Sequence, residues 1–337
     1  MTRRVLIGST AALALATGAS GTASKRGGNR RSVPRGRVIA EVESRLLRPL
    51  TVLAFALASV AALPAAGGTN APTGRIAFSL ASGTLPNTDI PNADVYAVNA
   101  DGSGLVRLTD DPMADFDPSW SPDGQRIAYR HEDKESGQIY VMNADGSQQR
   151  NLTRRRGLDY SPAWSPDGTR IAFGSVRAGK ATIWVMRPDG SGRRRLSRVY
   201  GEYPAWSPDG RKIAFDHITF VSNNWDIWVM NAVGSGARPL IASGASEQGP
   251  AWSPDGRTIA YQSDRGAPGN YARVWLARSD GSGRHLLTRQ LGERPVWSKR
   301  GGYVLFTGTR IFFVRRDGSG LRSVQVPGEP FLTDWTR

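Results

Sequence analysis

A five-residue motif that recurs at a nearly constant spacing is the feature of the sequence that most constrains the fold. Trp-Ser-Pro-Asp-Gly begins at Trp120, Trp164, Trp206 and Trp252, and a degenerate copy, Trp-Ser-Lys-Arg-Gly, begins at Trp297. Successive tryptophans lie 44, 42, 46 and 45 residues apart. A period in this range is typical of a repeat architecture in which each repeat is one supersecondary unit. Repeats of this kind usually build a binding surface rather than a catalytic constellation.

A single repeat predicts a meander of four antiparallel strands. In the repeat at residues 160–197, the Ser-Pro-Asp-Gly segment has Pro at the second position and Gly at the fourth, as a type I turn prefers. Residues 170–174 and 182–187 are rich in β-branched and aromatic residues and predict the second and third strands. An Asp-Gly-Ser-Gly turn then leads to the fourth. The middle strands are apolar on both faces, so each sheet must be covered on both sides, as in a radial stack.

The tail of the sequence predicts how the repeats close. The second and third strands each recur six times, but only five tryptophan motifs precede the tail. The first repeat begins at Gly74 without a first strand, and the tail supplies a sixth tryptophan, Trp335. We therefore expect an all-β, six-bladed β-propeller of four-stranded antiparallel blades, closed by the C-terminal strand completing the first blade. Such closure protects the strand edges that an open array would expose.

These motifs resemble the TolB-type, WD-like propeller repeats. The resemblance is carried by the tryptophan motif, by Ile-Ala-Phe at residues 171–173 and by Ile-Tyr-Val-Met-Asn-Ala-Asp-Gly-Ser at residues 139–147. It covers residues 74–337 and implies a propeller that binds protein in the cell envelope. TolB itself has an N-terminal α/β domain, for which the leader of this chain leaves no room. We therefore expect a TolB-like propeller without that domain, and the partner known for TolB does not carry over.

The first 73 residues differ in composition from the repeats and are predicted to be an export leader with its linker. Apolar stretches at residues 5–19 and 51–66 are separated by a basic linker at residues 25–37. The second stretch resembles a signal peptide, and its core is shorter than the roughly 20 residues that span a bilayer. The opening Thr-Arg-Arg resembles a twin-arginine export signal. Two alternatives are a start codon nearer the second stretch and an uncleaved membrane anchor.

The expected destination is the periplasm, the cell envelope or the outside of the cell, with a mature form that begins near residues 66–70. The chain has no cysteine, which excludes disulfides, thiolate metal sites and a lipoprotein anchor. Its net charge is +15, but residues 1–67 hold 10 of the 44 basic and only 2 of the 29 acidic residues. The remaining excess of +7 is mixed along the sequence, so nucleic acid is not an expected partner.

The sequence offers no recognisable catalytic constellation. It contains no Gly-x-Ser-x-Gly elbow, and its histidines, His131, His217 and His285, fall in different repeats. Metal ligands must converge within a few ångströms, so we expect no metal and no cofactor. The Asp-Gly-Ser-Gly turns are distributed over the repeats, whereas a calcium loop collects its oxygens at one point.

The candidate site residues lie on the face opposite the Pro-Asp-Gly turns, where loop lengths vary. An acidic residue precedes each first strand, and the set comprises Asp115, Asp159, Glu202, Glu247, Glu293 and Glu329. These carboxylates are predicted either to form a negative funnel for a basic peptide or a cation, or to accept backbone hydrogen bonds as framework, and both roles can coexist. Trp225 and Tyr271, expected in loops between second and third strands, are candidates for apolar contacts.

The leading hypothesis is an exported, monomeric, non-enzymatic propeller that binds a protein or peptide partner, with membrane contact only through an uncleaved leader. One alternative is a carbohydrate-active enzyme, a lyase or hydrolase, with its site at the propeller channel. Another is a structural component of the envelope. Blade framework is what the repeats specify, and the partner is chosen by the loops, so the sequence does not name it.

Overall fold

The computed structural model describes six stretches of the chain: residues 72–84, 91–132, 136–154, 157–219, 224–269 and 271–336. Within these ranges the ordered elements are strands, and no helix is present. None of the described residues belongs to a helix that is long and apolar enough to cross a membrane. Nearly all of the predicted export leader, residues 1–71, lies outside the described residues.

The strands follow one another in sets of four. The first sheet contains β1 (Arg75–Thr84), β2 (Pro91–Asn99), β3 (Val106–Arg107) and β24 (Pro330–Trp335). An eight-stranded sheet follows, with β4 (Ala114–Trp120), β5 (Arg126–Glu132), β6 (Gly137–Asn143), β7 (Arg150–Asn151), β8 (Leu158–Trp164), β9 (Ile171–Arg177), β10 (Lys180–Met186) and β11 (Arg194–Arg195). A single parallel pair, Gly137 with Leu158, joins its two halves.

Three further four-stranded sheets complete the described part of the protein. They contain β12 (Glu202–Trp206), β13 (Lys212–Thr219), β14 (Asn224–Asn231) and β15 (Arg238–Ile241); β16 (Glu247–Trp252), β17 (Thr258–Ser263), β18 (Arg273–Arg278) and β19 (His285–Leu291); and β20 (Glu293–Trp297), β21 (Tyr303–Thr307), β22 (Ile311–Arg315) and β23 (Arg322–Val324). All pairings within these sheets are antiparallel. The predicted all-β class and four-stranded antiparallel sheets are confirmed.

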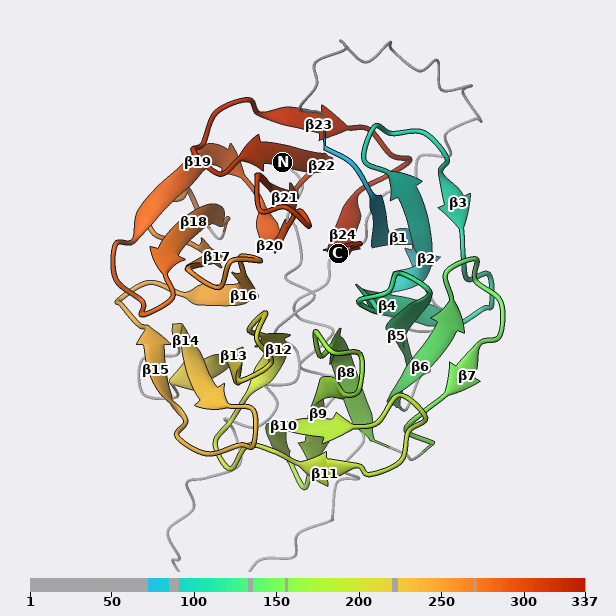
Figure 1. Cartoon of the computed structure of the whole chain (residues 1–337). Coiled ribbons are helices and arrows are strands. Elements are labelled where there is room, and N and C mark those ends of the chain that lie inside the picture. The colour runs from blue at the N-terminus through green and yellow to red at the C-terminus, as the bar shows by residue number, and fades with distance from the viewer. Residues whose placement is uncertain are drawn as a thin grey trace, which may run out of the picture.

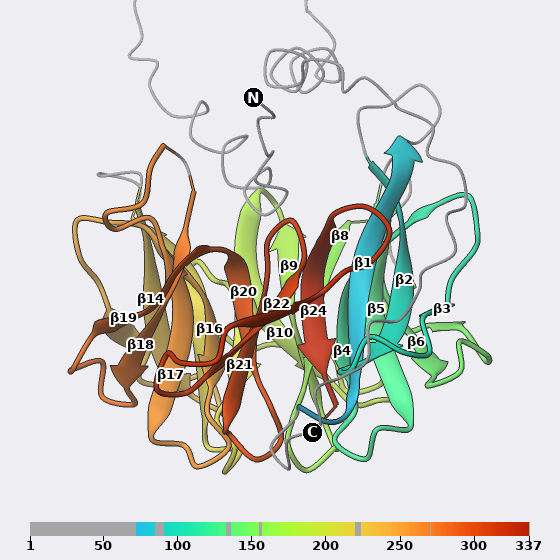
Figure 2. The same ribbon diagram turned by 90° about the horizontal axis from the view of Figure 1, so that it is seen from above.

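The sheets are arranged in sequence order around a common centre (Figure 1). The strands that end in the repeated tryptophans, β4, β8, β12, β16, β20 and β24, lie nearest the centre, and the fourth strands lie at the rim. Seen from the side, the strands stand roughly upright across the thickness of the ring (Figure 2). Both apolar faces of each sheet are thereby covered by neighbouring sheets.

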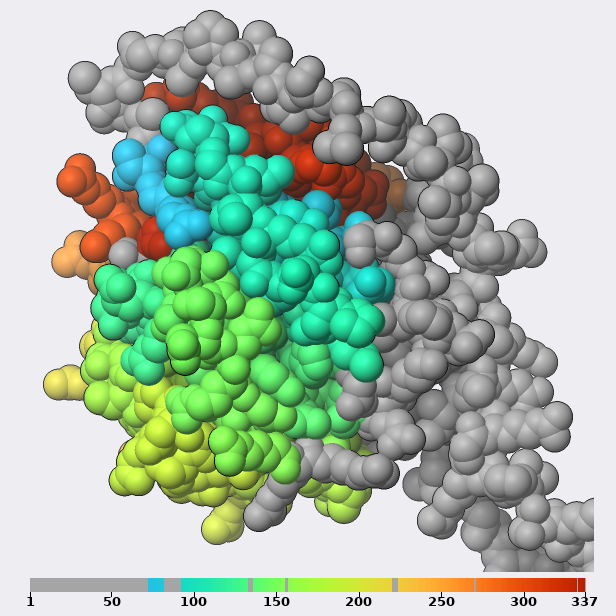
Figure 3. All heavy atoms as spheres, turned by 90° about the vertical axis from the view of Figure 1, so that its right-hand side faces the viewer, coloured from blue at the N-terminus to red at the C-terminus, as the bar shows by residue number. Residues whose placement is uncertain are grey.

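The first and last of the described strands share one sheet. Strand β24 pairs with β1, with Ile76 opposite Trp335. The Trp335 ring is fully buried, and its Nε1 donates a hydrogen bond of 3.0 Å to the Thr73 carbonyl. Figure 3 shows the blue atoms of the first repeat beside the red atoms of the last. The N-terminal edge of the repeat array therefore has a strand partner from the tail.

The Trp-Ser-Pro-Asp-Gly turns close through the same hydrogen bonds in each copy. In the first copy, the Ser121 hydroxyl donates to Asp123 at 2.5 Å and accepts from the Arg126 N–H at 2.9 Å. Gly124 completes the turn with φ of 70°, which glycine adopts at little cost. The degenerate copy lacks the aspartate, but Ser298 still accepts the Tyr303 N–H. The serine and the glycine thus suffice for the turn.

These turns lie on the same face as the turns after the third strands. The Ala144 N–H donates to the Gln125 carbonyl at 2.8 Å, and the Ala232 N–H donates to the Arg211 carbonyl at 2.8 Å, so the two turns of a repeat touch. This is the arrangement that the meander predicts.

Hydrophobic clusters fill the space between successive sheets. In one of them, Trp206 and Phe215 pack with Ile183 and Val185 of the preceding repeat, and all four are nearly or fully buried. The Trp206 Nε1 also donates to the Ala163 carbonyl, again across the interface. Burying a large aromatic ring contributes several kcal/mol, so these interfaces account for the repetition of the tryptophan.

Candidate functional site

The innermost strands β4, β8, β12, β16 and β20 each contain a bulge that begins about three residues before the tryptophan. In β4 the pairing register shifts between Phe116 and Ser119. The residue at this position has a positive φ in five repeats: Asp117 (53°), Ser161 (49°), Tyr203 (47°), Gly249 (62°) and Arg294 (53°). We refer to these five as the axial residues. Because a left-handed backbone costs a non-glycine residue about 1–2 kcal/mol, the surrounding repeat must impose this conformation.

A proline follows every axial residue: Pro118, Pro162, Pro204, Pro250 and Pro295. Proline has no N–H and is tolerated in a strand only where the N–H side is unpaired, at a sheet edge. Since the innermost strand is such an edge, the prolines line the centre of the ring.

The axial residues and their prolines line a cavity of about 400 Å³. Its walls continue through the six repeated tryptophan positions to the prolines of the Pro-Asp-Gly turns and to Lys299, so the cavity lies toward the turn face. A second hollow, of about 430 Å³, lies between two neighbouring turns beside Asp209 and Asp255, whose carboxylates are already hydrogen-bonded within those turns. We therefore take the axial cavity as the candidate site.

Arg294 crosses the floor of this cavity. Its guanidinium carbon lies 3.5 Å from the centroid of the Tyr203 ring, and its Nη1 lies 4.0 Å from Asp216 Oδ2. The backbone N–H of Arg294 donates to Gln262 at 2.9 Å. A Cβ on Gly249 would lie 3.5 Å from Arg294 Cδ, so a longer side chain there would compete with the arginine for space.

Asp117 occupies another side of the floor and is tied to the repeat that follows it. Its Oδ2 accepts both the N–H and the hydroxyl of Ser161, each at 3.0 Å. Arg130 Nε lies 3.6 Å from the same oxygen, and Arg130 Nη1 lies 3.1 Å from Glu132. Arg130 therefore has two carboxylates as counterions, whereas Arg294 has a single distant one.

Burial changes the charge of the carboxyls around the floor. Burial raises the pKa of Asp216 to about 8, although the nearby Arg294 lowers it. Burial likewise raises the pKa of Glu202 to about 7, against the hydrogen bond from Tyr200 that lowers it. Near neutral pH, Asp216 is therefore mostly protonated and does not fully neutralise Arg294.

The structure does not bring the six predicted acidic residues together as an exposed ring. Asp115, Asp159, Glu202 and Glu247 are each at most 2 % exposed. Glu293 is half-buried and Glu329 is exposed. Four of the six carboxylates are thus withdrawn from solvent, which corrects the expectation of a negative funnel.

The buried members serve as framework, but through side chains rather than through the backbone N–H groups that the sequence suggested. Asp115 pairs with His131 Nδ1 at 2.8 Å, and Asp159 pairs with Arg177 at 2.7 Å. Glu202 accepts the Tyr200 hydroxyl, and Glu247 accepts the Ser243 hydroxyl. Each buried acid thus has a different side-chain partner in its own repeat. Such pairs are not apparent from the sequence when each position of the repeat is considered alone.

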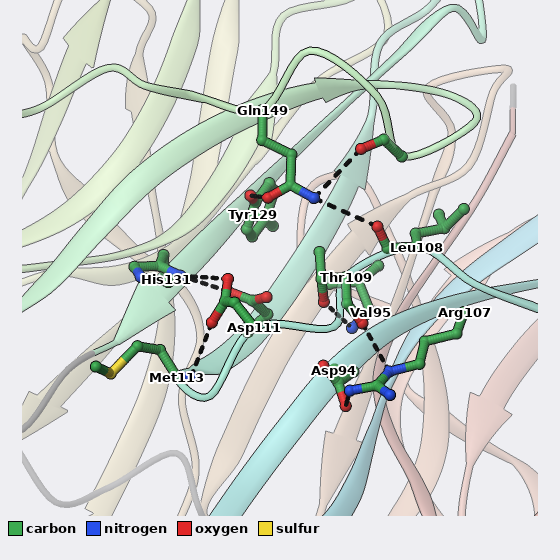
Figure 4. A network of polar contacts seen from close by, with 12 residues as sticks. Asp94, Val95, Arg107, Leu108, Thr109, Asp111, Met113, Tyr129, His131 and Gln149 are labelled. Carbon is green, nitrogen blue, oxygen red and sulfur yellow. Dashed lines mark hydrogen bonds and ion pairs between the residues drawn. The ribbon is translucent and has the colours of Figure 1, made fainter.

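Around His131 the acidic side chains approach one another. The ligand atoms of Asp111, Asp115 and His131 all lie within 4.8 Å, a grouping that could hold a metal ion. Figure 4 shows the Asp111 carboxylate directed toward His131 and accepting the Met113 N–H. The other two histidines lie outside this grouping. The His217 ring stacks on the Trp228 ring with their centroids 4.0 Å apart, and His285 is exposed.

The two predicted aromatic contacts have different outcomes. Trp225 lies in strand β14 opposite Ile218, not in a loop, and is only 7 % exposed because it packs against Ile218 and Tyr200. It is therefore a core residue. Tyr271 lies in the connection between β17 and β18 and is 37 % exposed, so it stays a candidate for surface contact.

A ring of four-stranded antiparallel sheets with a cavity on its axis defines the protein as a β-propeller. The family model described as the TolB beta propeller domain matches residues 116–203 and 197–320, and the chain belongs to this family. The predicted resemblance is confirmed. The comparison with curated proteins finds no matching sequence.

Solved structures show the same fold at low sequence identity. TolB from Acinetobacter baumannii is 22 % identical with a TM-score of 0.67, over 79 % of this chain and 67 % of that one. The putative TolB from Agrobacterium tumefaciens is 21 % identical with a TM-score of 0.61, over 77 % and 90 %. Hydrazine synthase from Kuenenia stuttgartiensis is 16 % identical with a TM-score of 0.65, over 79 % and 46 %. The fold thus recurs in an enzyme as well, so it does not decide function.

The axial residues were not singled out from the sequence, although a signal for them exists. Counting three residues back from each tryptophan gives Asp, Ser, Tyr, Gly and Arg, directly before a proline that is the same in all five repeats. A variable side chain directly before an invariant proline indicates a position with a fixed backbone whose side chain does not face another repeat.

Proposed function

We propose that this protein is an exported, non-enzymatic propeller that binds a protein or peptide segment at the axial cavity. The propeller has six blades, counting each half of the eight-stranded sheet as one, and is closed by the pairing of β24 with β1. The observation that carries the proposal is the cavity of about 400 Å³, which falls within the size range of ligand sites and is open at the turn face.

The family supports a binding role over a catalytic one. Two of the structural neighbours are TolB proteins, and the TolB-type propeller implies protein binding in the envelope. The signal-like stretch at residues 51–66 supports export. The enzymatic alternative requires a nucleophile or paired acid and base at the cavity. Its floor instead holds Arg294 stacked on Tyr203 and Asp117 bonded to Ser161.

Site-specific photo-crosslinking in the producing cells tests this proposal. A photoreactive amino acid replaces Lys299, which is exposed and lines the cavity. The matched control places the same group at Val233, which is 69 % exposed in the turn between β14 and β15. We expect a discrete crosslinked product with a protein or peptide from position 299 and none from position 233. Equal products from both positions, or none from either, would contradict the proposal.

A further inference from the structure

The Arg294 guanidinium lacks hydrogen-bond acceptors in the described part of the protein. Its side chain donates no hydrogen bond to a described residue, and its single ion pair there, with Asp216, is 4.0 Å long. The side chain is 14 % exposed and lines the axial cavity. A guanidinium has five N–H donors, and those of Arg294 keep some access to solvent. Arg294 is therefore a cation at the cavity with its binding capacity unused.

Several carboxyls act on Arg294 through their charge, but among the described residues only Asp216 lies within 4.0 Å of its guanidinium. Asp117 is bonded to Ser161 and lies near Arg130, and Arg130 is also paired with Glu132. The raised pKa of Asp216, caused by burial, leaves that carboxyl mostly protonated at neutral pH. The stacked Tyr203 ring supports a cation but donates no negative charge. Carboxyls at a distance thus act on Arg294, but no described carboxylate makes a direct hydrogen bond with its guanidinium.

The prolines in the cavity walls leave Arg294 with little competition from backbone donors. The five prolines after the axial residues have no N–H, so the backbone offers no competing donors there. Tryptophan and proline rings supply about half of the remaining lining, which also contains Lys299, Asp334 and Thr333. An anion that enters the cavity therefore meets two cationic side chains: Lys299, which is exposed, and Arg294, which belongs to the axial residues.

We propose that the axial cavity receives a carboxylate of the partner segment, held by Arg294. The fork of the guanidinium matches a carboxylate with two parallel hydrogen bonds. The carboxylate belongs to an acidic side chain of the partner or to its C-terminus, since both have this chemistry. The inference rests on the proposed function and deepens it. It also reverses the sign of the partner expected from the acidic residues of the sequence.

Short capped peptides test the recognised charge. The full-length protein is titrated with acetyl-Ala-Asp-Ala-amide and with acetyl-Ala-Asn-Ala-amide, which differ in one charge at nearly equal shape. A second pair, acetyl-Ala-Ala-Ala with a free carboxylate and with an amide end, tests the C-terminal source. Binding is followed by tryptophan fluorescence, because tryptophans line the cavity. We expect one carboxylate peptide to bind about tenfold or more tightly than its amide.

Substitutions of Arg294 test whether this residue causes the preference for carboxylate peptides. In Arg294→Gln the preference for the carboxylate disappears, whereas Arg294→Lys retains part of it because the charge remains. Arg289→Gln removes an exposed arginine and serves as the control for net charge. Thermal unfolding of each variant reports on folding. If Arg294→Gln is unfolded, the Arg294→Lys titration decides, and full affinity for the carboxylate with lysine refutes a bidentate contact.

The two proposals fail in different ways. Equal binding of carboxylate and amide peptides, or an unchanged preference in folded Arg294→Gln, overturns the carboxylate inference and leaves crosslinking at position 299 unaffected. Loss of crosslinking at position 299 with a retained carboxylate preference overturns the protein-binding function instead. If the carboxylate peptide binds more tightly than its amide in only one of the two pairs, that pair identifies the source of the carboxylate.

Discussion

The turn after each tryptophan and the axial position three residues before it differ in what the repeats hold constant. The turn repeats Ser-Pro-Asp-Gly four times with the same hydrogen bonds, and each turn glycine after the first lies close to the proline of the preceding turn. The axial position repeats its backbone conformation but not its side chain. A residue that faces the next repeat is constrained by that repeat, whereas a residue that faces the axis is free to specialise.

The carboxyls in the turns also differ from Asp216, a buried carboxyl that lies beside the axial residue Arg294. In the turns, the Ser207 hydroxyl and the Arg211 N–H hydrogen-bond to Asp209 and lower its pKa. Near the axis, burial raises the pKa of Asp216 to about 8. Turn carboxylates therefore stabilise the fold as anions, whereas burial stabilises Asp216 as a neutral acid.

The strongest test of the comparison removes a framework tryptophan. Trp335→Ala is expected to lower the free energy of unfolding by about 3–5 kcal/mol, because the ring is fully buried and packs edge-on against Phe313. Deleting residues 331–337 should cost more, since it also exposes the edge of β1. Thermal and denaturant unfolding measure both effects.

Val233→Ala is the control for this tryptophan, because Val233 is 69 % exposed and its truncation should change stability by less than about 0.5 kcal/mol. A truncated protein that unfolds at the temperature of the full-length protein would falsify closure through β24.

The second test compares two carboxylates over pH. A folded-state pKa above the unfolded value of about 3.9 means that the parent loses stability as pH rises from about 4 toward 8. Asp216→Asn removes this loss, so its stability relative to the parent should rise between pH 5 and pH 8 by more than about 1 kcal/mol. Denaturant unfolding at several pH values measures the trend.

The matched variant is Asp209→Asn in the turn. A lowered pKa means that the turn carboxylate stabilises the protein above about pH 4 and loses this effect only as pH falls through the folded-state value. Its variant should therefore be about 1 kcal/mol less stable than the parent, with no change between pH 5 and pH 8. Parallel pH profiles for the two variants would show that the carboxyls of Asp216 and Asp209 do not differ.

The prediction with the smallest expected effect tests backbone strain at a residue that lies outside the cavity. Ala178 has a φ of 48° in the tight turn between β9 and β10, so it shares the left-handed backbone of the axial residues without lining the cavity. Ala178→Gly should stabilise the protein by about 0.5 kcal/mol, because relieved strain slightly exceeds the added entropy of the unfolded state. Denaturant unfolding measures it, and peptide binding should not change. A loss of stability would show that the turn imposes no strain on alanine.

Much of the architecture was predictable from the sequence alone. The spacing of the tryptophans set the repeat length, the alternation of apolar runs and turns located the strands, and the tail tryptophan indicated a partner for the first repeat. These features occur in every repeat, and each copy has the same local environment. A strand or turn that is ambiguous in one repeat can therefore be assigned from the other repeats. Trp225 shows the limit: without a counterpart in other repeats, it was assigned to a loop and lies in β14.

What the sequence determined by itself is the repeated unit: its strands, its turns and its family. Only the tertiary structure decided which side chains meet at the axis, because Asp117, Tyr203, Gly249 and Arg294 come from different repeats and are brought together by the ring. It also decided that four of the six regular acids are buried and paired, whereas Arg294 keeps unused donors at the cavity. Burial and pairing depend on residues distant in the sequence, and they set both the charge of a group and its access to a partner.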